Sequence, residues 1–584
     1  MAVRDLNIGM VGSGGDGVMV GGEAVVSAVA RKGLNCIMLK SYGPQIRGGE
    51  SSCKIRISSE KVSTQADELD VLLAFNWKDY PRFGSELMLR PGRLVIEEGG
   101  PDTPEPERPI VGPEPGAIYR IPLTSLAREA TGGTRARNMV ALGALGKLCS
   151  LPDQPLRHSI EKLFKSKGTE VVQDNLKAYQ LGRDYAERNL DRLEQIELAV
   201  DEHRRVEERV VMTGNDAVAY GAMLAGCRFF AGYPITPSSD IMEWLSIQMP
   251  KFGGTMVQTE DEMAALGMVL GASLAGAKAM TATSGPGLSL MTEMIGLAAI
   301  AEIPCVIVDV QRGGPSTGIP TKSEQSDLMH AVYGGHGDFP RVVMAPADVS
   351  DCFDVMREAF FISEKYQIPV IVLSDGFIGH RKASIVPPDI SKYRPYYRNR
   401  PKPDPDAEYL RFAFTETGVS PMSIPGMQHV LYRAAGIEHD EKGRPTSDFK
   451  VHQMMNEKRF KKLESIVQDV NFMRVYGPEK AKVAVLSWGS NKGAVRNAVK
   501  ILNERGQAVK GIIPQVLYPL AVDKLKGHLA GAERVLIIEL AYSRQFYKVL
   551  QTQMELPPGI VHYGRSGGQP LGIGEVVEEI EKLL

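Results

Sequence analysis

Four loops between residues 231 and 327 carry side chains that could do chemistry. They read AGYPITPSSDI, QTEDEMAALG, TATSGPGLSLM and VDVQRGGPSTGIPTKSEQSDL. Each borders a strongly apolar run, which indicates a strand or a buried helix. Such loops gather ligand-binding groups when they open at one edge of a parallel sheet. The content and order of the four loops therefore indicate an enzyme.

The first loop places hydroxyl groups beside the start of a helix. Pro237 disfavours helical angles at Thr236. Ser238 or Ser239 is suited to cap the helix that should follow. Unpaired amides at such a helix end can seat a carboxylate or a phosphate, although an ordinary capped turn would need the same residues.

The second loop ends in three acidic residues, Glu260, Asp261 and Glu262, at the start of a helix rich in Gly and Ala. Acidic residues in a first turn often only complement the helix dipole. Glu262 directly precedes the small-residue run 263–271, so we expect its carboxyl to be more buried than its two neighbours. A buried carboxyl can share a proton with a ligand nitrogen.

The third and fourth loops contribute glycine and a cation. SGPG at 284–287 permits close approach of a ligand, although a tight turn between strand and helix needs nothing more. Arg312 follows the apolar strand PCVIVDVQ and precedes a loop rich in backbone donors. An arginine in this place could clamp a carboxylate with two hydrogen bonds, and the alternative is a surface ion pair.

Together, the four loops resemble the pyrimidine-binding domain of the 2-oxoacid:ferredoxin oxidoreductases, thiamine-diphosphate enzymes that decarboxylate 2-oxoacids and form acyl-CoA. The resemblance implies that Thr236 contacts the oxoacid and that Arg312 binds its carboxylate. It implies that Glu262 is the catalytic glutamate, which pairs with the aminopyrimidine of the cofactor. Further cofactor contacts are then expected from the same loops, at Tyr233, Pro234, Ile235, Ser284 and Gly285.

The resemblance extends to both ends of the chain. Residues 1–185 resemble the gamma subunit or domain of this family, through GMVGSGGDGVMVGGEAVVSAVARKG, SYGPQIRGGESSCKIRIS and RNMVALGAL. Residues 479–584 resemble its transketolase-C-terminal-like domain, and their alternating strands and helices predict a parallel sheet. We therefore expect an α/β chain of three parallel-sheet domains. A charged helical linker at 186–209, a pyrimidine-binding domain at 210–385 and a connector at 386–478 complete the predicted division.

Near the N-terminus, an apolar strand at 8–11, a glycine loop at 12–17 and a helix at 18–30 predict a dinucleotide-type arrangement. Lys40 stands where a nicotinamide-binding fingerprint needs an acidic residue, which argues against a dehydrogenase. The loop could instead face the phosphates of coenzyme A, with contacts from Gly12, Gly14 and Arg47. The alternative is a tight turn and a subunit contact.

Two parts of such an enzyme are missing from the sequence. Gly15, Asp16 and Gly17 begin the GDG motif that holds thiamine diphosphate and magnesium, but 40–48 lacks the asparagine that the resemblance requires, so we expect no metal site here. The cysteines are scattered and are interpreted as buried, reduced thiols: Cys36, Cys53, Cys149, Cys227, Cys305 and Cys352. The resemblance implies a beta subunit that supplies Mg²⁺, a [4Fe-4S] cluster and the path to ferredoxin, in a dimer of heterodimers.

The substrate is predicted from residues 418–460, which resemble the 2-oxoglutarate branch of the alpha subunits. Burying a second carboxylate unpaired would be costly, so Arg312 and Lys322 are candidates for the two carboxylate ends. The run 438–441 is interpreted as a solvated turn or a subunit contact and not as a metal site. The resulting hypothesis is oxidation of 2-oxoglutarate with CoA to succinyl-CoA and CO2. Pyruvate or a branched or aryl oxoacid is the first alternative, and a non-catalytic scaffold is the second.

Length and composition agree with this hypothesis. The chain has 584 residues, of which 43% are hydrophobic and 24% charged, so we expect several globular domains. A net charge of -2 gives no signature of nucleic-acid binding. Neither an export leader nor an apolar run of membrane-spanning length is evident, which predicts a cytoplasmic protein.

Overall fold

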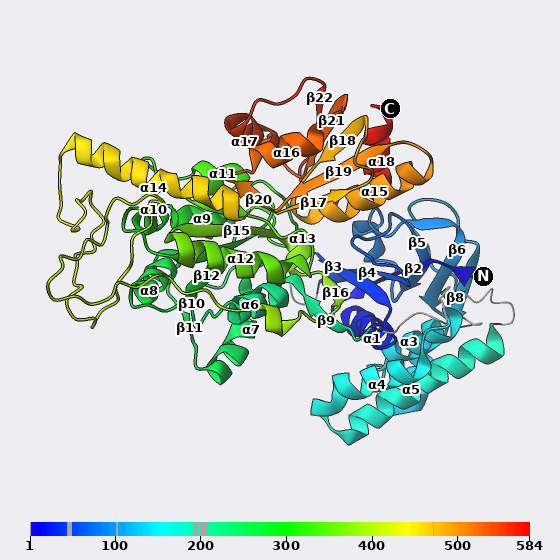
Figure 1. Cartoon of the computed structure of the whole chain (residues 1–584). Helices are drawn as coiled ribbons and strands as arrows, with labels where there is room; N and C mark the ends of the chain where they lie inside the picture. Colours follow the sequence, from blue (N-terminus) through cyan, green and yellow to red (C-terminus); the bar gives the residue numbers. More distant parts are fainter. Residues whose placement is uncertain (1, 44–48, 101–102, 191–196, 199–206, 471) are drawn as a thin grey trace. The chain divides into compact units, whose positions relative to one another are not determined.

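The computed structural model describes residues 2–43, 49–100, 103–190, 197–198, 207–470 and 472–584 (Figure 1). The chain forms two compact units. One consists of Met1–Thr213 and His380–Pro387, and the other of Gly214–Gly379 and Pro388–Leu584. The division into five segments expected from the sequence stays a prediction.

The described residues of the first unit form an eight-stranded sheet and five α-helices. Its strands are β2 (Asp5–Ser13), β3 (Asn35–Tyr42), β4 (Glu50–Ser58), β5 (Leu69–Ala74), β6 (Leu89–Glu98), β7 (Ala117–Ile121), β9 (Val210–Thr213) and β16 (Lys382–Ile385). Its helices are α1 (Val18–Arg31), α2 (Leu123–Thr131), α3 (Arg137–Leu148), α4 (Asp153–Phe164) and α5 (Thr169–Asn189). A separate parallel pair joins β1 (Ala2–Val3) to β8 (Glu197–Leu198). The strand at 8–11 and the helix at 18–30 are thus confirmed, each slightly longer than predicted.

The strand order of this sheet is β7-β6-β5-β2-β4-β3-β16-β9. β2, β5, β6 and β7 pair in parallel, whereas the pairs from β2-β4 to β16-β9 are antiparallel. The expectation of a parallel sheet is wrong for the half of the sheet that runs from β2 to β9. Residues 43–49 are too short a connection between β3 and β4 for a parallel crossover, so the two strands must form a hairpin.

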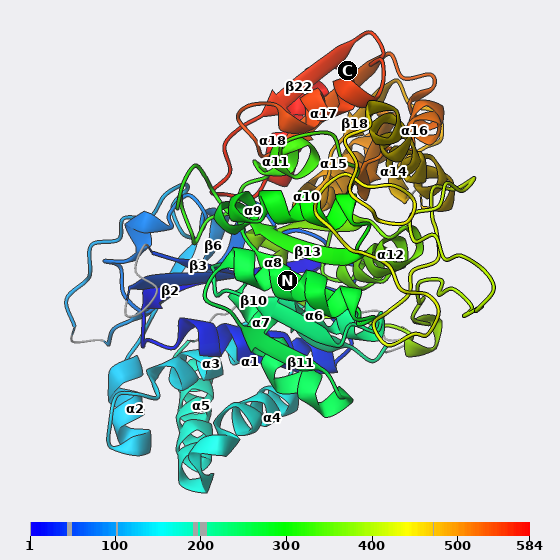
Figure 2. The same cartoon turned by 90° about the vertical axis from the view of Figure 1, so that its left-hand side faces the viewer.

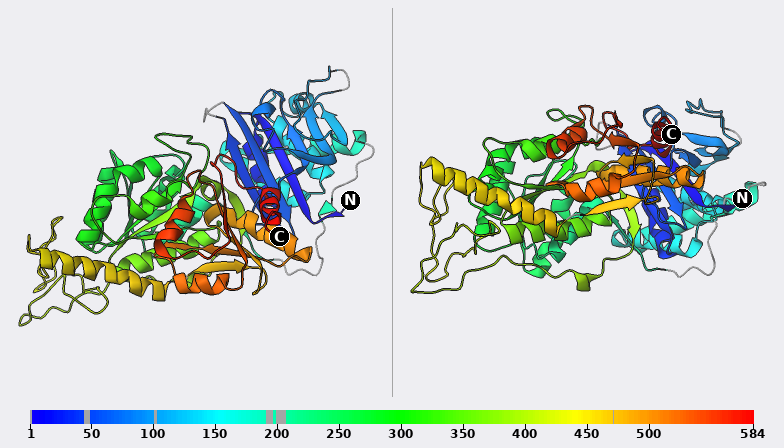
Figure 3. Two further views of the ribbon diagram at one scale, coloured as in Figure 1. Left: turned by 90° about the horizontal axis from the view of Figure 1, so that it is seen from above. Right: turned by 45° about the horizontal axis from the view of Figure 1, so that its top comes forward.

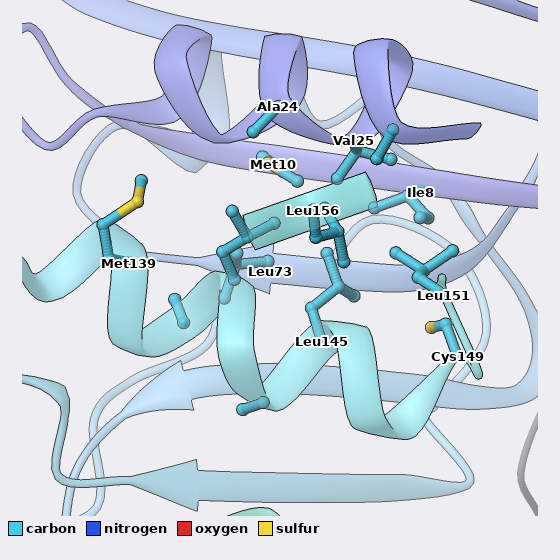
Figure 4. Packing of buried hydrophobic residues seen from close by; sticks show 14 of the residues in the cluster. Ile8, Met10, Ala24, Val25, Leu73, Met139, Leu145, Cys149, Leu151 and Leu156 are labelled. Atoms are coloured by element: carbon cyan, nitrogen blue, oxygen red, sulfur yellow. The ribbon is translucent and has the colours of Figure 1, made fainter. Parts of the chain in front are cut away.

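Alternate residues of the central strands face two cores. Ile8 and Met10 of β2 and Leu73 of β5 pack against α1, α3 and α4 (Figure 4). Val11 and Leu72 face the opposite side and pack in a cluster that contains several aromatic rings. The helices α1, α3, α4 and α5 gather on one side of the sheet (Figures 1 and 2). Successive side chains of a strand alternate between the two faces of the sheet, and here both faces are buried. These strands therefore appear in the sequence as near-continuous apolar runs.

Small residues bring α3 and α5 into backbone contact. A Cβ atom on Gly143 would overlap the carbonyl oxygen of Tyr179, and one on Gly182 would overlap that of Val140. The two helices therefore approach as closely as only glycine permits. This contact explains the small-residue sequence RNMVALGAL in α3.

The second unit is built around a seven-stranded sheet. Its strands are β10 (Phe229–Gly232), β11 (Thr255–Gln258), β12 (Ala279–Thr283), β13 (Cys305–Gln311), β14 (Val342–Met344), β15 (Pro369–Asp375) and β20 (Val516–Tyr518), in the order β11-β10-β12-β13-β15-β14-β20. All pairs are parallel except β14-β20. The predicted parallel sheet is confirmed here.

Eight helices accompany this sheet. They are α6 (Gly214–Leu224), α7 (Ser239–Gln248), α8 (Glu262–Leu274), α9 (Gly285–Leu290), α10 (Thr292–Ile300), α11 (Leu328–Tyr333), α12 (Asp351–Tyr366) and α13 (Gly376–Gly379). The helices α8 to α11 share one core with alternate residues of β13 and β15. α12 packs against α6 and also contacts β13 and β15.

A five-stranded sheet forms the C-terminal part of the second unit. Its strands are β17 (Met473–Tyr476), β18 (Val483–Leu486), β19 (Val509–Pro514), β21 (Arg534–Glu539) and β22 (Ile560–Gly564). They alternate with α15 (Lys492–Glu504), α16 (Val522–Leu529), α17 (Gln545–Gln553) and α18 (Ile573–Glu581). β18 is parallel to β19 and β21, β22 is parallel to β21, and β17 is antiparallel to β19.

The apolar run VKGIIPQVLYPL forms two strands in two sheets, whereas the sequence predicts one parallel sheet for 479–584. β19 pairs in the C-terminal sheet, whereas β20 pairs with β14 of the seven-stranded sheet. Pro514 ends β19, and proline cannot donate a ladder hydrogen bond from its nitrogen. The two sheets of this unit are thereby joined through the main chain, and α8 to α11 share a hydrophobic core with the C-terminal strands.

The connector at 388–448 is irregular and is followed by the long helix α14 (Phe449–Asp469), which runs beside it (Figures 1 and 3). Buried ion pairs attach both to the rest of the unit. Glu302 accepts hydrogen bonds from Lys458 and Lys462 of α14, at 2.5 Å each. Arg398 of the connector pairs with Glu364 of α12 at 2.6 Å. Burial would raise the pKa of Glu302, but the two lysines hold it far below its ordinary value.

Two further predictions concern the linker and the thiols. α5 ends at Asn189, and Glu197–Leu198 is a strand, so a helical linker is wrong at 197–198; 191–196 and 199–206 lie outside the described residues. A leucine pattern alone did not reveal that these residues pair with β1.

All six cysteines are free and buried, as predicted. Among the described residues, no helix combines the length and the apolar composition needed to cross a bilayer.

We expect Glu302→Gln to destabilise the attachment of α14 by about 3–5 kcal/mol, because two buried lysines lose their counter-charge. The measurement is the free energy of unfolding, combined with limited proteolysis within 388–470. Glu457→Gln, an exposed position on the same helix, serves as the matched control. Equal stability of the two variants would contradict a structural role for the buried cluster.

Candidate functional site

The four loops meet at one edge of the seven-stranded sheet. β10 ends at Gly232, β11 at Gln258, β12 at Thr283 and β13 at Gln311. Gly232 pairs with Gln258, and Thr283 pairs with Asp309 two residues before the end of β13. Because these strands are parallel, all four loops leave the sheet in the same direction. The expectation that they open at a common edge is confirmed.

The loop after β10 is tied to the loop after β13. Arg312 Nη1 donates a hydrogen bond to the carbonyl oxygen of Thr236 at 2.8 Å. Tyr233 and Pro234 are exposed, and Ile235 and Thr236 are half-buried. The contact brings together the two residues expected to bind the oxoacid.

The serine cap predicted for α7 is wrong. α7 begins at Ser239, but Ser238 has near-helical backbone angles, and its side chain does not cap the helix. Its hydroxyl instead donates to the carbonyl oxygen of Ile235 at 2.9 Å. The sequence placed the helix correctly because proline and serine mark its start, but it could not show which way the hydroxyl points.

Glu262 lies at the first position of α8. Asp261 is the N-cap, and its carboxylate accepts a hydrogen bond from the amide of Ala264 at 2.7 Å. Glu262 is only 5% exposed and is more buried than Glu260 and Asp261, as predicted. No described residue donates a hydrogen bond to its carboxylate. A buried carboxylate without a protein partner is costly, so this group is well suited to receive a ligand donor.

Two positions of the SGPG turn leave space that other side chains use. A Cβ atom on Gly287 would overlap Thr283 Oγ1 and lie 2.7 Å from Glu262 Oε1. A Cβ atom on Gly285 would lie 2.8 Å from Asp327 Oδ2. Ser284 is buried, and its hydroxyl is without a hydrogen-bond partner among the described residues. Gly285 and Gly287 therefore leave room for neighbouring side chains in addition to permitting a tight turn.

Arg312 is 7% exposed, so a surface ion pair is excluded. Burial lowers the pKa of its guanidinium, and the nearby carboxyls of Asp327 and Asp309 oppose that effect. Its Nε atom is buried and has no hydrogen-bond partner in the described parts of the chain. The guanidinium thus retains a donor for an anion.

A cavity of about 660 Å³ opens beside Arg312. Its wall includes Gly285, Ser289, Arg312, Asp327, His330 and Tyr542. Lys322 is half-buried on the same loop but is not part of this wall, so its proposed contact with a carboxylate stays a prediction. Burial lowers the pKa of His330, which favours the neutral imidazole.

Several wall residues were missed by the sequence analysis. His330 lies in a short helix whose sequence resembles an ordinary amphipathic turn, and Asp327 closes a polar loop. Tyr542, Ser543 and Ser566 come from the C-terminal sheet, more than 200 residues after Arg312. The only local signal was that Tyr542 and Ser543 follow the buried strand β21 and that Ser566 follows β22.

The carboxylate of Asp16 holds the glycine loop of the first unit in place. Asp16 Oδ2 accepts from the amide of Ser13 at 2.8 Å, and Arg137 pairs with Asp16 Oδ1 at 2.6 Å. The amide of Gly14 donates to Gly49 at 2.7 Å, and Gly12 belongs to β2. Arg47 lies outside the described residues. Contacts of this loop with coenzyme A stay a prediction.

The interpretation of 438–441 as a solvated turn is wrong for His439, and its alternative, a subunit contact, stays a prediction. His439 is fully buried, with its ring 4.0 Å from that of Phe412. Burial alone would raise the pKa of Glu438, but hydrogen bonds from Arg459 and His452 lower it to about 2. The sequence could not show that α14 supplies these partners. Within the described residues, no cluster of metal-ligating side chains occurs.

Comparisons with known proteins agree with this site. The family described as pyruvate flavodoxin/ferredoxin oxidoreductase, thiamine diP-bdg, matches residues 220–458. A second family, described as pyruvate ferredoxin/flavodoxin oxidoreductase, matches residues 7–185.

Three relatives illustrate the range of similarity. The 2-oxoglutarate synthase subunit KorA of Methanothermobacter thermautotrophicus is 38% identical, over 60% of this chain and 94% of its own. The 2-oxoacid:ferredoxin oxidoreductase subunit alpha of Saccharolobus solfataricus is 31% identical, over 98% and 97%. The 2-oxoglutarate:ferredoxin oxidoreductase of Magnetococcus marinus, solved with 2-oxoglutarate, coenzyme A and succinyl-CoA bound, is 37% identical over 99% of both chains, with a TM-score of 0.92.

Gly287→Ala should lower the melting temperature of the chain, because the added methyl group must displace Thr283 or Glu262. Gly271→Ala is the matched control in α8, since a Cβ there meets no atom within 4 Å. Its expected effect is a gain of about 0.5–1 kcal/mol from the better helix propensity of alanine. Thermal unfolding of both variants measures the contrast. A Gly287→Ala chain as stable as Gly271→Ala would show that Glu262 is not held against this turn.

Proposed function

Since the chain belongs to the 2-oxoacid:ferredoxin oxidoreductases, as an alpha subunit with a gamma-like N-terminal region, we propose that its substrate is 2-oxoglutarate. In the proposed reaction, 2-oxoglutarate, coenzyme A and two oxidised ferredoxins give succinyl-CoA, CO2, a proton and two reduced ferredoxins. The KorA relatives and the Magnetococcus marinus structure support this choice of oxoacid.

The unpaired carboxylate of Glu262 is the observation that carries the proposal. A buried carboxylate that no described residue satisfies fits the pyrimidine half of thiamine diphosphate, whose ring nitrogen can share a proton with it. The absence of a side chain at Gly287 leaves the room that the Glu262 carboxyl occupies. When bound, thiamine diphosphate supplies the carbon nucleophile for the keto group and accepts the electron pair released with CO2.

Arg312 and Thr236 would orient the oxoacid. The guanidinium is fixed by its bond to the carbonyl oxygen of Thr236, and its unpartnered Nε can donate to the carboxylate next to the keto carbon. Burial strengthens such a charged hydrogen bond because little water competes for the anion. Lys322 remains the candidate for the distal carboxylate, and Tyr233, Pro234, Ile235, Ser284 and Gly285 for contacts with the cofactor.

A beta subunit would complete the site. We infer that it holds the diphosphate with Mg²⁺, carries the [4Fe-4S] cluster and passes electrons to ferredoxin, and that two alpha-beta pairs form the enzyme. Among the described residues, the Glu262 carboxylate and the Nε atom of Arg312 have no partner, which is costly in a chain that binds nothing and disfavours a purely scaffolding subunit. Pyruvate remains the chief alternative substrate because the matching family descriptions name it.

We expect ferredoxin reduction only when this chain is combined with its beta subunit, and a kcat/KM for 2-oxoglutarate at least tenfold higher than for pyruvate. The second carboxylate of 2-oxoglutarate gains a charge-assisted hydrogen bond that pyruvate lacks. Steady-state assays with CoA and a panel of 2-oxoacids measure both. Turnover by the isolated chain would contradict the shared site, and preference for pyruvate would overturn the assignment of substrate.

Replacing Glu262 by Gln should reduce kcat by at least about 10²-fold while the melting temperature stays within a few degrees, because the amide cannot exchange a proton with the pyrimidine nitrogen. Glu260→Gln, two residues earlier and exposed, is the matched control. Assays of the two-chain complex, with quantification of bound thiamine diphosphate, separate loss of binding from loss of catalysis. Normal turnover by the Glu262→Gln complex would remove Glu262 from the mechanism.

A further inference from the structure

Two carboxyl groups lie side by side behind the Arg312 wall of the cavity. Asp309 belongs to β13 and is 0% exposed. Asp327 precedes α11, lines the cavity and packs against Gly285. Asp309 and Gln311 point to the same face of β13, and the amide of Asp327 donates to Gln311 Oε1 at 3.2 Å, so the fold brings Asp327 to the face that carries Asp309.

These carboxyls lack donors. Within the described residues, no N–H or O–H of another group reaches either oxygen of Asp309 or the Oδ2 atom of Asp327. Two adjacent ionised carboxylates without donors would repel each other in a water-poor environment. A proton placed between them satisfies both, with Asp309 as donor and Asp327 as acceptor.

The surroundings contain few compensating charges. Arg312 lies at the end of β13, Glu324 on the loop before α11 and His330 on α11, and all three line the cavity together with Tyr542. Glu262 lies on the other side of the short helix α9. With both aspartates and Glu324 ionised, the wall would carry three negative charges against the single positive charge of Arg312. An anionic oxoacid would be repelled from the guanidinium that should bind it.

We propose that Asp309 and Asp327 hold a shared proton beside Arg312, and that this acid pair takes up a second proton when an anionic oxoacid binds in the cavity. This rests on the proposed function, because the oxoacid is the anion. The buried Nε of Arg312, 7% exposed as a residue and without a partner among the described groups, provides the seat for that anion. The acid pair adjusts the charge of this seat and does not touch the reacting carbon.

The expected direction of the pH dependence follows from the ionisation of the pair. Burial, followed by the charge of Asp327, raises the pKa of Asp309 well above its ordinary value. Burial also raises the pKa of Asp327 to about 6. Below that pH the second proton is present and the wall is less negative. Above it Asp327 is ionised, so the oxoacid must bring a proton with it and binds more weakly.

The experiment measures KM for 2-oxoglutarate between pH 5.5 and 8 in the complete two-chain enzyme. In the wild type, KM should rise with pH by up to about tenfold per unit above the pKa of the pair. Asp327→Asn should give a low KM that no longer depends on pH, because the charge is gone. Asp309→Asn should give a high and nearly flat KM, because an amide donor stabilises ionised Asp327. General damage to the fold would not be expected to change KM in opposite directions in these two variants.

Matched variants separate this effect from other charges in the wall. Glu324→Gln removes a permanent charge, so it should lower KM at every pH and keep the slope. His330 titrates in the same sense, and His330→Gln should likewise leave the slope that belongs to the acid pair. A wild-type slope retained by Asp327→Asn, or a wild-type KM that is flat with pH, would overturn the proposal.

An infrared measurement on the full chain tests the shared proton without turnover. The carbonyl stretch of a protonated carboxyl should be present at neutral pH and absent from Asp309→Asn. Its absence from the wild type would refute the acid pair, whatever the enzyme does. Failure of the complex to oxidise any 2-oxoacid, with this band present, would refute the proposed function alone.

Discussion

The parallel pairing of β10, β11, β12 and β13 is the constraint on which the site depends. Since parallel strands end at a common edge, the loops that carry Glu262, Tyr233, Ser284 and Arg312 leave the sheet side by side, in the strand order β11-β10-β12-β13. A shift of one residue in β13 would turn Asp309 and Gln311 to the opposite face and separate Arg312 from Thr236. The continuous apolar strands protect this register because both faces of the sheet are covered.

Local signals in the sequence predicted much of this arrangement. Proline, serine and glycine marked the loop boundaries, and the small residues after Glu262 indicated its burial correctly. Features set by distant partners were not predictable in the same way. The strand β20 pairs with β14 and not with the C-terminal sheet, His439 is buried against Phe412, and Glu438 is paired with Arg459 of α14. The juxtaposition of Asp309 and Asp327 also required the fold, because a loop of irregular structure separates them.

The second unit treats buried charge in two different ways. Away from the cavity, buried ions are paired: Glu302 with two lysines of α14, and Arg398 with Glu364. At the loop edge, Glu262 has no partner among the residues that the structure describes, and the Nε of Arg312 is an unused donor there. The first arrangement fixes the connector to the core, whereas the second leaves a desolvation cost that a ligand can relieve. The contrast within one unit is what distinguishes the functional groups from the structural ones.

The C-terminal sheet determines the shape of the cavity as much as the four loops do. Gln325 donates to the carbonyl oxygen of Trp488 at 3.1 Å and accepts from Asn491 at 2.7 Å and from the amide of Leu540 at 3.1 Å. These buried bonds fix the segment between Arg312 and Asp327, so the wall moves only if the C-terminal sheet moves with it. Because every polar group of such a network must stay satisfied, a different arrangement of the loop would leave several of them unpaired. The C-terminal sheet is therefore the support that sets the distance between the arginine and the acid pair.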